Sequence, residues 1–141
     1  MGSESTLEVL KDSGLGDLEE DSLKLLVEFG GIKSFAKDEK IFVKDEPVTD
    51  SIFYVILSGQ MDVLRDTGEV ITTLARKEIV GETGLVVPGR KRSCTVVATE
   101  DVEVLEVDLK EIEEKNLALL SGIMERLEET VWGRMLSSLR N

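Results

Sequence analysis

The sequence contains no histidine and only one cysteine, Cys94, among its 141 residues. The absence of histidine removes the usual general base of Ser–His and Cys–His nucleophiles and the commonest neutral metal ligand. A lone cysteine can form neither an internal disulfide nor a thiolate metal cluster, and this usage is typical of a reducing compartment. An enzyme is therefore the least favoured class of function, and we expect neither a metal nor a cofactor.

Basic residues and long apolar runs are also scarce. Lys and Arg number 17 against 29 Asp and Glu, and the resulting net charge of −12 repels nucleic acids and acidic membranes. The longest apolar run, Ile52 to Leu57, is too short to span a bilayer, and the N-terminus lacks the pattern of a secretion signal. We expect a cytoplasmic protein, built as a single domain over residues 1–141, that itself binds neither nucleic acid nor membranes.

Residues 1–31 show the three- and four-residue spacing of leucines that is typical of amphipathic helices. Asp17 followed by Glu20 resembles a capping box, and the pair Gly30-Gly31 predicts the end of this helical segment. The chain is therefore expected to begin with helices.

Residues 32–107 change to a period of two, and polar or glycine-containing turns recur between the apolar stretches. Many short strands at such spacing indicate a sandwich or a closed roll, not a parallel sheet. The predicted strands are 41–43, 52–57, 61–63, 70–74, 95–98 and 102–107.

Residues 108–141 return to helical spacing. The apolar stripe is long for a helix that docks only on a small roll, so it suggests a partner helix, such as that of a homodimer. A helix docked on its own domain is the alternative, because Gly133 weakens the pattern. The stripe consists of Leu117, Leu120, Met124, Leu127, Val131, Met135 and Leu139.

Residues 80–95 carry the pattern with the most chemical content. Gly81 and Gly84 allow the backbone to approach a ligand closely, and a helical turn beginning near Thr83 would point free N–H groups at a phosphate. Arg92 adds a guanidinium fork for phosphate oxygens, and Ser93 adds a hydroxyl donor. The pattern indicates a small anion pocket.

Glu82 suits a ligand that carries a hydroxyl beside its phosphate, because a carboxylate accepts strongly from a ribose O–H. Arg90 and Lys91 fit a solvated hairpin tip instead. The alternative role for Arg92 is an internal ion pair with Glu82 in a domain that no longer binds a ligand.

The spacing from Glu82 to Arg92 and Ser93 resembles the phosphate-binding cassette of the cyclic nucleotide-binding domain, as found in the bacterial catabolite activator protein family. Most of the chain joins this resemblance. Its further motifs are Phe35-x-Lys37-x-Glu39-x-Ile41-Phe42, Tyr54-x-Ile56-Leu57-Ser58-Gly59 and the closing helix after Asp108.

The resemblance implies a mainly β fold with flanking helices. An eight-stranded, jelly-roll-like β-roll over residues 32–107 would lie between N-terminal helices and a long C-terminal helix. It also implies that Arg92 holds the cyclic phosphate and that Glu82 holds the ribose 2′-hydroxyl. The expected ligand-binding residues are Gly81, Glu82, Thr83, Gly84, Leu85, Arg92 and Ser93.

Three weaker ligand candidates follow from the same resemblance. The segment Arg126-Leu127-x-x-Thr130 is similar to the one from which the activator proteins present a threonine to the purine, so Thr130 is a candidate base contact. Arg126, one helical turn earlier, could meet the ligand or Glu82. Thr72 is a candidate contact for the edge of the base.

The chain departs from the family in three turns, where Asp38, Asp45 and Lys77 stand in place of the usual glycine. Aspartate tolerates a left-handed backbone, so Asp38 and Asp45 are mild changes, whereas Lys77, in the loop before the cassette, is the stronger departure.

Together these features predict a module that senses a cyclic nucleotide, cAMP more than cGMP, and passes occupancy to the C-terminal helix and an unidentified effector protein. Two alternatives stay open. One is a ligand-free interaction domain that works through its acidic surface. The other is the sensor portion of a longer transcription regulator, whose helix-turn-helix domain would follow Asn141.

Overall fold

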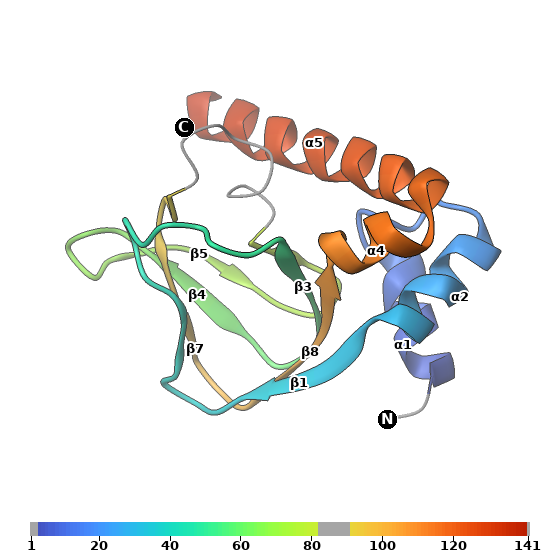
Figure 1. Ribbon diagram of the computed structural model, residues 1–141. Coiled ribbons are helices and arrows are strands. Elements are labelled where there is room, and N and C mark those ends of the chain that lie inside the picture. Colours follow the sequence, from blue (N-terminus) through green and yellow to red (C-terminus); the bar gives the residue numbers. More distant parts are fainter. Residues whose placement is uncertain (1–2, 82–90, 141) are drawn as a thin grey trace.

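The computed structural model describes residues 3–81 and 91–140 of the chain (Figure 1). Within them the chain forms eight strands in two four-stranded antiparallel sheets, which confirms the expected roll. The first sheet has the order β1-β8-β3-β6, with β1 Gly31–Phe35, β8 Val102–Asp108, β3 Ile52–Ser58 and β6 Ile79–Val80. The second has the order β2-β7-β4-β5, with β2 Lys40–Phe42, β7 Thr95–Ala98, β4 Met61–Leu64 and β5 Val70–Leu74.

Strand β3 explains the six-residue apolar run, because both of its faces are buried. Tyr54 and Ile56 point into the roll and join the core between the two sheets. Phe53, Val55 and Leu57 point the other way and join the core beneath the helices. Successive strand residues point to opposite faces, so a strand covered on both sides loses its polar alternation.

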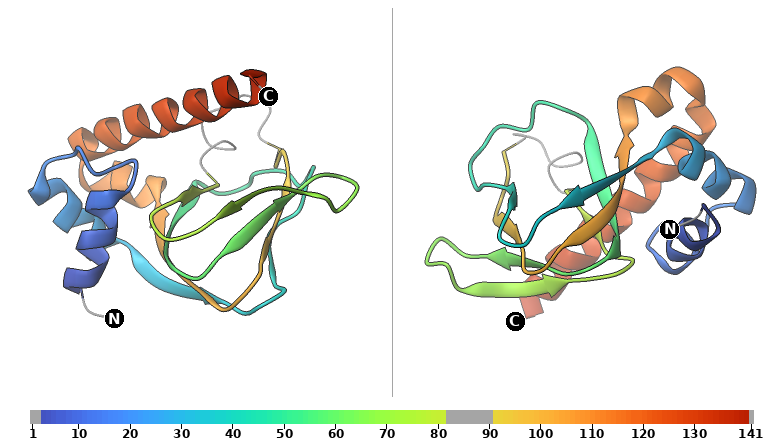
Figure 2. Two further views of the ribbon diagram at one scale, coloured as in Figure 1. Left: turned by 180° about the vertical axis from the view of Figure 1, so that it is seen from behind. Right: turned by 90° about the horizontal axis from the view of Figure 1, so that it is seen from below.

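Four helices flank the roll in the described parts of the chain: α1 Ser3–Asp12, α2 Glu20–Phe29, α4 Leu109–Lys115 and α5 Leu117–Arg140. In Figure 1, α1, α2 and α4 lie together at one end of the roll, and α5 starts there and continues over the roll. Figure 2 shows the same arrangement from behind and from below. No helix in the described ranges is long and apolar enough to cross a bilayer.

The predicted capping box is wrong. Helix α2 begins at Glu20 with Glu19 as its N-cap, and no side chain caps it. The Asp17 carboxylate accepts a hydrogen bond from Arg126 of α5 instead. The predicted end of the helix is confirmed, since the N–H of Gly30 donates to the carbonyl of Leu26 just before β1.

The prediction of the apolar stripe of α5 is partly wrong. Leu117 is 68% exposed, and the fully packed positions are Leu119, Ile123, Leu127 and Val131, four residues apart. This row packs against the chain's own helical core, together with the half-buried Leu120 and Met124. The described part of the stripe therefore docks on its own domain, and the side chains of Met135 and Leu139 lie outside the described residues.

The three turns without glycine are all left-handed, with φ values of 71°, 71° and 76° at Asp38, Asp45 and Lys77. Lys77 adopts this conformation despite its Cβ, at a cost of about 1–2 kcal/mol. Its N–H donates to the carbonyl of Ile56 at 2.8 Å, and the Ile56 N–H donates to Glu78 at 3.0 Å. Pairing with β3 thus fixes the loop that leads to the cassette.

Candidate functional site

The backbone around Arg92 is held by the loop that follows β2. The Arg92 N–H donates to the carbonyl of Glu46 at 2.9 Å, and the Asp45 N–H donates to the carbonyl of Arg92 at 2.8 Å. A bridge between Pro47 and Lys91 extends this pairing. The left-handed turn at Asp45 therefore sets the position from which the Arg92 side chain extends.

The guanidinium of Arg92 returns toward the start of the cassette. Its Nη1 donates to the carbonyl of Gly81 at 3.2 Å, and its Cζ lies 3.8 Å from the centroid of the Phe42 ring. Gly81 has a φ of 92°, and a Cβ added to it would lie 2.8 Å from Cζ of Phe42. Only glycine fits this position, because it tolerates the positive φ and has no Cβ to clash with the ring. The structure thus brings together Gly81 and Arg92, two of the predicted site residues.

A cluster of aromatic rings supports this pair from inside the roll. Tyr54 lies 6.0 Å from Phe42 and 5.5 Å from Phe35, measured between ring centroids, and Lys33 Nζ lies 5.2 Å from the Phe35 ring. The sequence has only four phenylalanines and one tyrosine, and three of these five rings meet in this cluster, which reaches Arg92 through Phe42. Sequence spacing did not indicate it, because the rings come from three different strands.

Tyr54 is neutral at physiological pH. The pKa of its phenol is raised to about 12, mainly by burial and to a smaller extent by the carboxylates of Glu106 and Asp50, while the positive charge of Arg92 acts in the opposite direction. The interior beside Arg92 is therefore apolar on its aromatic side, which strengthens local electrostatic interactions.

Five predicted cassette residues remain besides Gly81 and Arg92. Glu82, Thr83, Gly84 and Leu85 lie outside the described residues. Ser93 is exposed beside Arg92. Their expected roles stay predictions.

Thr72 is exposed on β5, an edge strand, where it pairs with Val63 of β4. Its expected contact with the base also stays a prediction.

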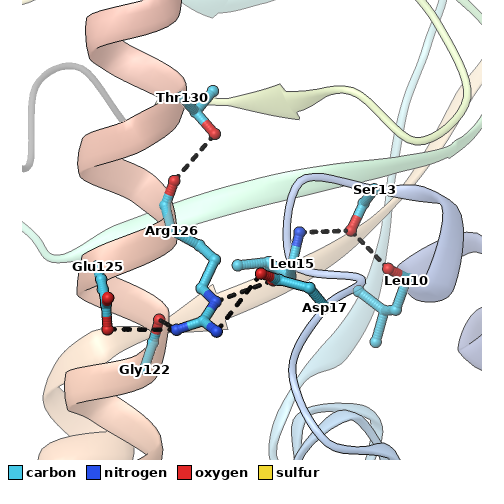
Figure 3. A network of polar contacts seen from close by, with 8 residues as sticks. All are labelled: Leu10, Ser13, Leu15, Asp17, Gly122, Glu125, Arg126 and Thr130. Atoms are coloured by element: carbon cyan, nitrogen blue, oxygen red, sulfur yellow. Dashed lines mark hydrogen bonds and ion pairs between the residues drawn. The ribbon is translucent and has the colours of Figure 1, made fainter.

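Arg126 is paired with Asp17 in the loop between α1 and α2, as Figure 3 shows. Its Nε lies 2.9 Å from Asp17 Oδ1, and its Nη1 lies 3.3 Å from both the Gly122 carbonyl and Glu125 Oε2. The hydrogen bond from Arg126 holds the pKa of the Asp17 carboxyl below its usual value. Asp17 is 109 residues away in sequence, so no local pattern signals this partner.

The Thr130 hydroxyl donates to the carbonyl of Arg126 at 3.0 Å within α5 (Figure 3). The same hydroxyl lies 3.1 Å from the position of a Cβ added to Gly14. Two glycines therefore allow a close approach here, because Leu18 also lies 3.0 Å from a Cβ added to Gly122. We name the contact of residues 13–18 with α5 the helix latch; it comprises Asp17–Arg126, Leu18–Gly122 and Gly14–Thr130.

A depression of about 530 Å³ lies beside β1 and β8 and includes Glu39, Asp101 and Glu103 in its lining. Glu39 accepts from the N–H of Ala36 and Asp101 from the N–H of Lys37, each at 3.0 Å. These carboxylates stabilise turns and repel anions. The arginine near Gly81, not this depression, is the candidate anion site.

Comparisons with known proteins agree with this geometry. The family model described as the cyclic nucleotide-binding domain matches residues 32–115. A Pycsar effector protein of Pseudomonas aeruginosa, PaPycTIR, is 37% identical over 100 residues, which are 71% of this chain and 32% of that protein. The chain thus spans about a third of the length of this curated relative.

Two solved structures share the fold at 20% identity. A cyclic nucleotide-binding domain from Methylobacillus flagellatus has a TM-score of 0.79 over 96% of this chain and 79% of its own. The regulatory domain of Toxoplasma gondii PKA, crystallised with cAMP, has a TM-score of 0.68 over 79% of this chain and 43% of its own. With more than half of its residues matched by the family model, the chain belongs to the cyclic nucleotide-binding domain family.

Proposed function

We propose that this chain is a sensor module that binds a cyclic nucleotide, cAMP in preference to cGMP, through Arg92. The observation that carries the proposal is the Arg92 guanidinium, which is held on the Phe42 ring next to the positive-φ Gly81. An immobilised guanidinium beside close-approach backbone suits a compact anion such as a cyclic phosphate.

The division of roles in this proposal follows ligand chemistry. Arg92 binds the cyclic phosphate, Glu82 accepts from the ribose 2′-hydroxyl, and Ser93 donates a further hydrogen bond. Gly81 and the segment 83–85 supply backbone N–H groups. The negative charge of the chain does not prevent this, because at about 4 Å one ion pair contributes roughly 4 kcal/mol, whereas distant charges are screened beyond about 8 Å.

The output in this proposal is the position of α5. The helix latch holds α5 on the α1–α2 loop, and Thr130, a candidate base contact, is part of it. A ligand that contacts both the roll and Thr130 favours one position of α5 by its differential affinity for the two positions. The position of α5 is then read by an effector, which is another domain, a second copy of the chain or a separate protein.

The test is calorimetric titration of the wild-type chain, Arg92→Ala and Lys91→Ala with cAMP, cGMP and adenosine. Lys91→Ala is the matched control, because it removes the same charge from the neighbouring exposed residue. We expect micromolar or tighter binding of cAMP by the wild type and by Lys91→Ala. Loss of a charge-assisted contact predicts binding weaker by roughly 100-fold for Arg92→Ala. Adenosine, which lacks the phosphate, should bind about as weakly.

Absence of heat with every cyclic nucleotide would refute the sensor proposal. The same result, with no change in melting temperature on adding nucleotide, would favour the ligand-free interaction domain.

A further inference from the structure

One aromatic side chain, Phe42, contacts both flanks of the segment between Gly81 and Arg92. Its centroid lies 3.8 Å from Cζ of Arg92, and its Cζ and Cε2 lie 2.8 and 3.1 Å from the position of a Cβ on Gly81. Arg92 also donates a hydrogen bond of 3.2 Å to Gly81, so Phe42, Gly81 and Arg92 all contact one another. Phe42 is therefore a platform on which the backbone of one flank and the guanidinium of the other both rest.

A ring holds a guanidinium differently from a carboxylate. The N–H donors of arginine lie in the plane of the group, so an aromatic ring against its face leaves those directions for hydrogen bonds. A carboxylate partner, by contrast, accepts those donors. Stacking on Phe42 restricts the rotamers of Arg92 without itself occupying those donors.

The platform itself is fixed to the roll. Lys40 and Phe42 oppose the consecutive residues Val97 and Val96 of β7, so the strand is irregular between them. Both Ile41 and Phe42 pack against the core inside the roll. Ile41 is thus an extra residue in β2, with no residue opposite it in β7. A bulge of this kind changes the direction of neighbouring side chains, and here it directs the Phe42 ring toward Arg92.

The Phe42 ring also lies near Tyr54, with 6.0 Å between the ring centroids, and Tyr54 contacts Phe35 edge-on at 5.5 Å. Aromatic pairs at these separations favour defined relative orientations. Phe42 is thus held by β7 and by Tyr54 before any ligand binds.

We propose that Phe42 is a positioning residue for nucleotide binding: it holds Arg92 against Gly81 in the orientation that receives the cyclic phosphate. This inference rests on the proposed function. Phe42 does not contact the nucleotide; it acts through the arginine and lowers the conformational cost of binding.

The test compares Phe42→Leu with Phe35→Leu. Both substitutions remove one ring from the same aromatic cluster and keep an apolar side chain, but only Phe42 stacks on Arg92. Calorimetric titration with cAMP should show about tenfold weaker binding for Phe42→Leu, the order expected for one cation–π contact. Phe35→Leu should stay within about twofold of the wild type, although both variants lower the melting temperature.

A second pair of variants separates positioning from a general loss of structure. Glutamine keeps hydrogen-bond donors at position 92 but carries no charge to place over the ring, so Phe42→Leu should change the Kd less than about twofold in the Arg92→Gln background. If Phe42→Leu does not fold, Phe42→Met takes its place, because methionine also lacks a ring and its flexible side chain adapts to irregular gaps in a core.

Wild-type binding combined with equal affinity of Phe42→Leu would overturn this inference and leave the proposed function standing. Equal losses in the Arg92 and Arg92→Gln backgrounds would overturn it as well. No binding by the wild type would overturn both.

Discussion

At the scale of single residues, Tyr54 is the most informative group, because it lies inside the roll beside Arg92 and is the only tyrosine of the chain. The ionisation of its phenol can therefore be followed without interference from another tyrosine. The pKa of this phenol therefore reports whether the interior of the roll is as apolar as the structure indicates.

We predict that the phenolate absorbance of the folded chain titrates with a midpoint of about 12, against about 10 in denaturant. Because the folded-state pKa is raised, the contribution to stability is complete below pH 10. It is lost as the pH rises from about 10 to 12, where the unfolded chain releases the proton first. A folded-state midpoint near 10 would mean that water reaches Tyr54 freely.

Only part of the candidate site at this scale can be compared with the prediction from sequence. The spacing predicted Gly81 and Arg92, and the structure brings them together. Phe42 and Asp17 were missed as partners of Arg92 and Arg126, because each contact joins residues more than 40 positions apart in sequence. Such contacts are set by tertiary packing, not by local pattern.

At the scale of elements, the helix latch joins α5 to the loop between α1 and α2 (Figure 3). Asp17 and Arg126 form its ion pair, and two glycines permit the close approach on either side. Exposed ion pairs contribute little to global stability, so the effect of breaking this one should be local to α5.

We predict that Asp17→Asn speeds amide hydrogen exchange in α5 while leaving exchange in the strands unchanged. Asp12→Asn is the matched control, because it breaks the exposed Arg76–Asp12 ion pair of 3.0 Å, which does not involve α5. Since the pKa of Asp17 is lowered in the folded state, the wild-type protection of α5 should persist above the usual pKa of aspartate. It should fall as the pH drops through the lowered value. Equal protection of α5 in both variants would show that the ion pair does not hold the helix.

The elements themselves were predicted unevenly. The six strands with clear alternation or a long apolar run were found, whereas β1 and β6 were not. Four of the five residues of β1 are exposed, and β6 has only two residues, so neither carries a hydrophobic period. The stripe of α5 was placed on Leu117 instead of Leu119, because leucines at both positions left the register of the helix ambiguous.

At the scale of the whole molecule, β3 and β8 connect the two apolar cores. Each strand contributes residues to the core inside the roll and to the core beneath the helices, as Ile56 and Val55 do in β3 and Val104 and Leu105 do in β8. Neither core can lose its packing without disturbing a strand of the other. We therefore expect one cooperative unit, a single domain.

We predict that thermal unfolding followed by far-ultraviolet circular dichroism and by fluorescence gives coincident transitions. Trp132, the only tryptophan, lies on α5, so its fluorescence reports on that helix. Val55→Ala, which opens a cavity on the helical side of β3, should lower both midpoints together, at a cost of about 2 kcal/mol. Two separated transitions would show that the roll and the helices unfold independently.

The central claim is that Arg92 receives the phosphate of a cyclic nucleotide, and a crystal structure of the chain with cAMP tests it most directly. The account predicts the cyclic phosphate within hydrogen-bonding distance of the Arg92 guanidinium, about 2.7–2.9 Å between nitrogen and oxygen, with Phe42 still stacked beneath it. A nucleotide bound elsewhere, or a phosphate that does not contact Arg92, would contradict it.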